Sequence, residues 1–95
     1  MRKIYKYTIE TTDVQTIKVP KLAGVNSFTE QFLKVDVQKE KPCIWCLVDT
    51  MEEEQEITLH VVGTGNPMPL LSKDNYLGSY MLYNGELVFH LFYEQ

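Results

Sequence analysis

The chain has 95 residues, of which 44% are hydrophobic and 12% aromatic, and its formal net charge is −4. This composition is that of a folded protein and the length allows one hydrophobic core, so we expect a single domain over residues 1–95. The acidic balance argues against binding to duplex nucleic acid, and no run of roughly 18 apolar residues suggests a membrane-spanning helix.

A two-residue period of apolar and polar side chains, typical of half-buried strands, recurs along the chain. Tyr5, Tyr7 and Ile9 show it near the N-terminus. The expected strands are residues 3–10, 15–19, 32–38, 43–48, 57–62, 76–83 and 87–93. With no amphipathic helix between them, they predict an all-β, mainly antiparallel fold, either a small sandwich or a partly open barrel of six or seven strands.

The connections between these segments differ in kind. Turn residues at 11–13 predict a hairpin between the first two strands. Residues 21–30 have the composition of a loop, with a helix over 27–34 as the alternative, and residues 51–56 form an acidic connection. The dipeptide Asn-Gly at 84–85 predicts a second hairpin, because both residues accept the positive φ angles of a tight turn.

The segment 43–48 is apolar throughout and contains the only tryptophan, Trp45, which predicts a central strand covered on both faces. Cys43 and Cys46 form a C-x-x-C motif within it. Zinc would need a second pair of ligands, and the two histidines of the chain lie thirty residues apart. Residues three apart on a strand point to opposite faces, so we expect neither a metal site nor a disulfide here, but structural cysteines.

The segment 63–67, with the sequence Gly-Thr-Gly-Asn-Pro, is the most unusual local feature. Its two glycines allow positive φ angles and expose successive backbone N–H groups that could cradle a phosphate; a turn that merely ends a strand is the alternative. It is neither a P-loop nor a dinucleotide fingerprint, because the required Lys and the third Gly are missing.

Other residues could complete such a site. Eight of the nine Lys and Arg residues lie within residues 1–41 and could pair with a phosphate; simple solvation of the surface is the alternative for each of them. Aromatic rings offer faces on which a nucleobase could stack, and packing within the fold is the alternative for each ring. The residues that we nominate for ligand binding are Gly63, Thr64, Gly65, Asn66, Tyr76, Trp45, Lys3 and Tyr5.

Catalytic chemistry is not indicated by the sequence. His60 and His90 lie within expected strands, and no nucleophile with a positioned base and no cluster of histidines and carboxylates is apparent. We therefore expect a protein that acts by binding, with no cofactor, no metal and no catalytic residue.

Several segments, taken in order, resemble a family of small β-rich proteins encoded by tailed bacteriophages. They are Ile4-Tyr5-Lys6-Tyr7, Asp13-Val14-Gln15-Thr16-Ile17 with Pro20, residues 42–49 and 60–67, Tyr76-Leu77-Gly78-Ser79-Tyr80, and residues 87–92. The resemblance spans nearly the whole chain, with residues 21–34 and 50–56 least covered. The family includes the phage anti-CBASS sponges, which bind the cyclic nucleotide signals of bacterial immunity.

This resemblance implies that the chain sequesters a cyclic di- or trinucleotide, such as 3′,3′-cGAMP, without cleaving it. It also implies a homo-oligomer with ligand pockets shaped partly by subunit contacts, acting in the cytoplasm of a bacterial host. Two alternatives remain open: a non-catalytic interaction or structural phage module acting on a host protein, for example through an exposed sheet edge, and a phosphodiesterase that degrades the same messengers.

Overall fold

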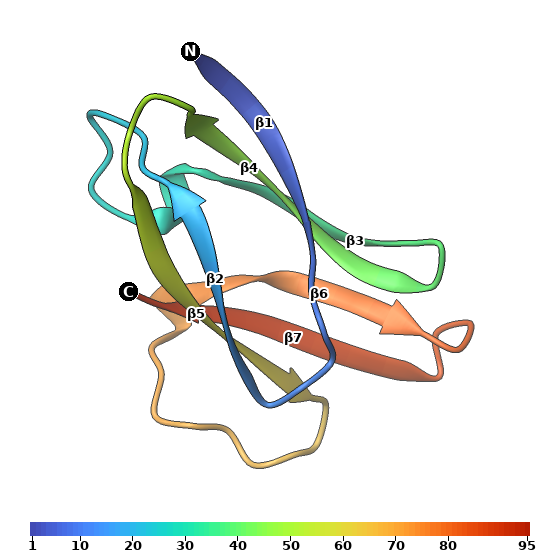
Figure 1. Cartoon of the computed structure of the whole chain (residues 1–95). Helices are drawn as coiled ribbons and strands as arrows, with labels where there is room; N and C mark the ends of the chain where they lie inside the picture. Colours follow the sequence, from blue (N-terminus) through green and yellow to red (C-terminus); the bar gives the residue numbers. More distant parts are fainter.

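Seven β-strands dominate the computed structural model, which describes residues 1–95 (Figure 1). The strands are β1 Arg2–Thr8, β2 Val14–Pro20, β3 Phe32–Gln38, β4 Lys41–Asp49, β5 Glu54–Gly63, β6 Tyr76–Leu82 and β7 Leu87–Glu94. Two single-turn 3₁₀ helices, η1 Phe28–Glu30 and η2 Lys73–Asn75, lie in the connections. The predicted all-β fold is confirmed, and no helix has the length and apolar character needed to span a membrane.

The strands form two antiparallel sheets, one with the order β1-β4-β3 and the other with the order β2-β5-β7-β6. The edge strands β3 and β6 run next to each other, as Figure 1 shows. Their approach is close at Gly78, where an added Cβ would lie 3.0 Å from Cγ1 of Val35. The two sheets therefore meet along one side and enclose a single cluster of buried side chains.

The connection between β1 and β2 is a crossover, so the predicted hairpin at this position is wrong. β1 pairs with β4 and β2 pairs with β5, so residues 9–13 carry the chain from one sheet to the other. Ile9 is buried here, and its N–H donates to the carbonyl of Pro42 at 2.9 Å. Periodicity shows which face of a strand is buried, but it leaves the identity of the paired strand open.

Other connections follow the sequence more closely. The Asn-Gly hairpin is confirmed: Leu82 pairs with Leu87, and residues 83–85 all have positive φ angles. The acidic connection is shorter than predicted, because β5 begins at Glu54 and takes up half of that acidic run. The predicted loop at 21–30 contains only the 3₁₀ turn η1, so the longer helix considered for 27–34 does not form.

The core lies between the sheets, and β4 and β5 supply most of it. Their inward-facing residues are fully or almost fully buried: Ile44, Cys46, Val48, Ile57, Leu59 and Val61. β4 is central in its sheet, as predicted, but it is covered on one face only, since Trp45 on the other face is only partly buried. The apolar segment 43–48 suggested cover on both faces. Its outward residues are instead shielded by side chains of their own sheet, and no second layer covers them.

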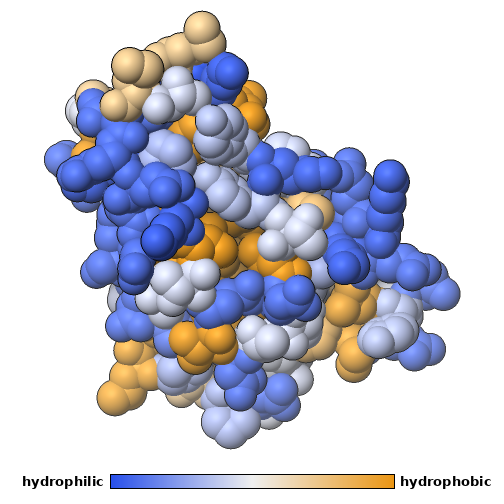
Figure 2. All heavy atoms as spheres, viewed as in Figure 1, coloured by the Kyte–Doolittle hydropathy of each residue, from blue (hydrophilic) through white to orange (hydrophobic).

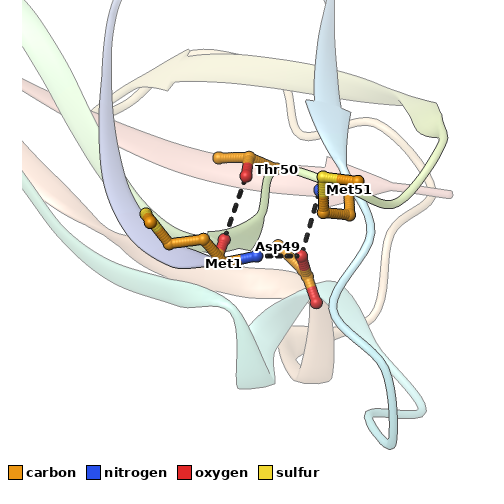
Figure 3. Close-up of polar contacts among 4 residues, drawn as sticks. All are labelled: Met1, Asp49, Thr50 and Met51. Carbon is orange, nitrogen blue, oxygen red and sulfur yellow. Dashed lines mark hydrogen bonds and ion pairs between the residues drawn. The ribbon is translucent and has the colours of Figure 1, made fainter.

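The ends of β1 and β4 are fastened together by polar contacts (Figure 3). The ammonium group of Met1 donates to Oδ1 of Asp49 at 3.1 Å, and Oγ1 of Thr50 donates to the carbonyl of Met1 at 3.2 Å. The N–H of Met51 also donates to Oδ1 of Asp49, and this bond, together with the ammonium group, lowers the pKa of that carboxyl. These contacts hold the basic edge strand in register.

A two-residue turn between β3 and β4 predicts a stabilising substitution. Lys39 and Glu40 have φ angles of 53° and 67°, a conformation that costs a residue with a side chain roughly 1 to 2 kcal/mol. Glu40→Gly should therefore raise the free energy of unfolding by about 0.5–1 kcal/mol, measured by urea denaturation, since part of the gain is lost to unfolded-chain entropy. Glu52→Gly, at an exposed position without a positive φ, is the control; equal destabilisation by both variants would contradict this account.

Candidate functional site

The glycine-rich segment after β5 is a tight turn. The N–H of Asn66 donates to the carbonyl of Gly63 at 3.0 Å, and Gly65 has a φ of +89°, which the turn requires. The N–H of Thr64 donates to the carbonyl of Val88 at 3.0 Å. The N–H of Gly65 makes no hydrogen bond within the chain, but its neighbours on both sides use theirs, so the expected cradle of successive free amides is not formed.

A groove of about 540 Å³ lies beside this turn, which we call the loop groove. Its lining residues come from the crossover, from β5 and from the segment that follows: Asp13, Val14, His60, Val61, Val62, Gly63, Asn66, Pro67, Met68 and Pro69. Apolar side chains and proline rings make up much of the lining, with one carboxylate, one carboxamide and one imidazole as its polar side chains. This mixture is usual for a site that binds a small organic ligand.

Aromatic side chains stand on the outer face of the four-stranded sheet. The ring of Tyr76, which is 42% exposed, lies 5.2 Å from the ring of Phe92 and 6.2 Å from that of His90, measured between centroids. Nε2 of His90 in turn lies 2.8 Å from Oγ1 of Thr64. Two of the nominated residues, Tyr76 and Thr64, are thereby linked through a histidine.

Both histidines belong to this face, although they are thirty residues apart in the sequence. His60 pairs with Phe92 and Val62 pairs with His90, so the two imidazoles lie on the same side of β5 and β7. Nε2 of His60 is 2.7 Å from a carboxylate oxygen of Glu94. Sequence reasoning missed this grouping, since only the register of β5 against β7 reveals it. No group of three or more His, Cys, Asp or Glu side chains that could hold a metal ion is present.

The remaining nominated residues lie elsewhere. Trp45 is on the outer face of the three-stranded sheet, where Nζ of Lys34 lies 5.4 Å from its ring. Tyr5 packs against the core, with its ring 6.4 Å from that of Tyr7, and Lys3 is exposed on the edge strand β1. One subunit therefore does not unite Trp45, Lys3 and Tyr5 with the glycine-rich turn.

The two cysteines are free and buried, and they point to opposite faces of β4, as predicted. Burial in the core raises the pKa of the Cys46 thiol to about 12. Sγ of Cys43 lies on the other face, 3.7 Å from Oγ1 of Thr8. A thiol with such a pKa is a poor nucleophile at neutral pH, so Cys46 is a packing residue.

A family model described as a domain of unknown function, DUF7352, matches residues 1–95. Searches among curated proteins and among solved structures found no match.

Proposed function

The chain belongs to the DUF7352 family along residues 1–95. From the resemblance of its sequence to the phage anti-CBASS sponges, we propose that it binds cyclic oligonucleotide messengers such as 3′,3′-cGAMP and holds them without cleavage. In this proposal it is a phage immune-evasion protein that blocks CBASS-type signalling in the cytoplasm of the host. The observation that supports it is the loop groove, next to the aromatic face that Tyr76, His90 and Phe92 form.

The size and lining of the loop groove suit part of such a ligand. Its volume of about 540 Å³ is within the range of roughly 300–1,000 Å³ that small-molecule sites occupy. Aromatic rings offer stacking surface for a purine, and the carboxamide of Asn66, the free N–H of Gly65 and the imidazole of His90 offer polar groups for hydrogen bonds.

The charge in the loop groove suggests how a ligand would lie. Asp13 contributes a carboxylate, and no Lys or Arg lines the groove, so phosphates would avoid the Asp13 end. A carboxylate accepts hydrogen bonds from the N–H groups at the edge of a guanine, whereas an adenine edge has fewer donors to offer. We therefore place a guanine near Asp13 and the phosphates toward Thr64 and Gly65.

The mechanism would be stoichiometric, because the proposal contains no chemical step. Each groove would remove one messenger from solution, and slow dissociation would keep it from the effector protein. A homo-oligomer whose subunits close over the groove would slow dissociation further, since it would shield more of the ligand from water. Protection of the effector then requires that binding sites outnumber messenger molecules.

Alanine substitution at Tyr76 tests the site. Stacking on an aromatic side chain contributes roughly 1–3 kcal/mol per base, so Tyr76→Ala should raise the Kd for 3′,3′-cGAMP about tenfold or more in calorimetric titration. Tyr83→Ala is the matched control, because Tyr83 is 70% exposed at the far hairpin and should leave the Kd unchanged. Equal affinities of the two variants would remove the site assignment.

The alternative function is a non-catalytic interaction with a host protein, and one surface favours it. Two hairpin ends border a second groove of about 590 Å³, where Met81 and Tyr83 are 60% and 70% exposed; Leu87, just after the same hairpin turn, is 45% exposed. Exposed apolar side chains grouped in this way are typical of contact surfaces. If this alternative holds, cyclic nucleotides will not change the melting temperature, and Tyr83→Ala will abolish capture of a host protein by the purified chain.

A further inference from the structure

The outer face of the three-stranded sheet holds the only tryptophan among basic side chains. Lys6 on β1 and Lys34 on β3 are the register partners of Trp45 on β4. By strand alternation, Arg2 and Lys41 lie on the same face of the sheet. The same alternation puts Ile4, Asp36 and Asp49 there. We call Trp45, the four basic residues and these three residues the tryptophan face.

Positive charge on the tryptophan face exceeds negative charge, and the excess lies at Lys6 and Lys41. Lys34 forms an ion pair with Asp36 at 3.2 Å, and Arg2 is the register partner of Asp49, whose pKa it helps to lower. Lys41 forms no ion pair, and Nζ of Lys6 donates to a neutral carboxamide, Oε1 of Gln38, at 2.7 Å. The chain as a whole is acidic, with a net charge of −4. This local excess of positive charge on an acidic molecule makes the face attractive to an anion such as phosphate.

Apolar surface accompanies this charge. Ile4 is 61% exposed, and the indole of Trp45 remains partly accessible. Figure 2 shows hydrophobic side chains as separate patches among hydrophilic ones on the side of the molecule in view. An indole beside lysines offers a stacking surface for a planar base and cations for the phosphate attached to it.

We propose that the tryptophan face binds a nucleotide, with the base stacked on Trp45 and Ile4 and the phosphate paired with Lys6. This site is independent of the loop groove, because the loop groove belongs to the other sheet. The site would contact one base and one phosphate. Free mononucleotides, cyclic dinucleotides and single-stranded nucleic acid all contain this unit.

Trp45 is the only tryptophan in the chain, so its fluorescence reports directly on this site. Titration with 5′-GMP should quench the emission along a saturable curve, whereas ribose 5-phosphate, which lacks the base, should leave it unchanged. Lys6→Gln should raise the concentration of half-maximal quenching about fivefold, since it removes one exposed charge contact. Lys18→Gln, on the other sheet, is the matched control and should have no effect on the quenching.

Parallel titrations with 3′,3′-cGAMP and a short single-stranded deoxyadenosine oligomer identify which form of nucleotide the site prefers, because the preferred form quenches at the lowest concentration.

If 5′-GMP quenched the fluorescence linearly with concentration, with the slope that free N-acetyltryptophanamide gives, the quenching would be collisional and the proposal would be overturned. The same half-maximal concentration in Lys6→Gln and Lys18→Gln would also overturn it. Tyr76→Ala separates this site from the loop groove, because it should weaken calorimetric binding of 3′,3′-cGAMP at the loop groove and leave the quenching by 5′-GMP intact. Loss of the quenching in Tyr76→Ala would show that the two sites are not independent and would also contradict the proposal.

Discussion

Phe28→Ala should destabilise the protein more than any other substitution considered, lowering the free energy of unfolding by about 3–5 kcal/mol. Phe28 is completely buried although it belongs to the 3₁₀ turn η1. Its ring lies 6.3 Å from that of Phe32 and 5.6 Å from that of Tyr93, so it joins the two sheets. Removal of the ring leaves a cavity that strands on both sides cannot fill without leaving their register.

Urea denaturation of the wild-type chain and the Phe28→Ala variant measures this effect. Met81→Ala is the control, because Met81 is 60% exposed on β6, and its replacement should change the free energy of unfolding by less than about 0.5 kcal/mol. Phe28→Leu should fall between the two, since leucine refills part of the space. A loss below about 1 kcal/mol for Phe28→Ala would mean that η1 does not dock into the core as described.

Gln31→Leu should lower the free energy of unfolding by about 2–4 kcal/mol, although it replaces a polar side chain with an apolar one of similar size. Gln31 is 1% exposed, and its carboxamide donates to the carbonyls of Pro20 and Leu47 at 2.9 and 3.0 Å. Its oxygen accepts from Gln55 at 2.7 Å, and Gln55 accepts in turn from Gln95. Leucine would take the side-chain donor away from both carbonyls.

The comparison variant for this experiment is Gln38→Leu, because Gln38 is exposed on β3 and bonds only to Lys6 through its side chain. We expect its stability to stay within about 0.5 kcal/mol of the wild type. The carboxamide network joins the loop before β3 to β4, β5 and the C-terminal residue, so its loss should also reduce cooperativity. If Gln31→Leu were as stable as Gln38→Leu, the buried network would have no role in stability.

Strand positions were predictable because alternation is a local property. The segment 32–38 was predicted at its observed bounds, and the predicted Asn-Gly hairpin forms between β6 and β7. Which strands pair with each other was harder to predict from the sequence, since the turn residues after β1 gave no sign that the chain crosses to the second sheet. Phe28 and Gln31 lie in a segment with no periodicity, so nothing local indicated that either is buried.

The candidate site was predictable in part. The glycine-rich turn was recognised as unusual, and it does border a groove, but the use of its amides within the chain could not be read from residue types. The link from Thr64 through His90 to Tyr76 depends on the register of three strands. Trp45 was nominated for its stacking chemistry, yet only the fold shows that it stands with Lys6 and Lys34 on the other sheet.

The central claim is sequestration, and one measurement tests it most directly. The purified chain is mixed with 3′,3′-cGAMP, the shift in melting temperature is recorded, and the nucleotide is quantified after the protein has been denatured by heat. At a ligand concentration about a hundredfold above Kd, binding adds about 2.7 kcal/mol, which for a domain of this size raises the melting temperature by about 10 °C or more. We predict this shift together with complete recovery of intact 3′,3′-cGAMP. No shift with any cyclic di- or trinucleotide, or a shift followed by recovery of cleaved nucleotide, would contradict sequestration.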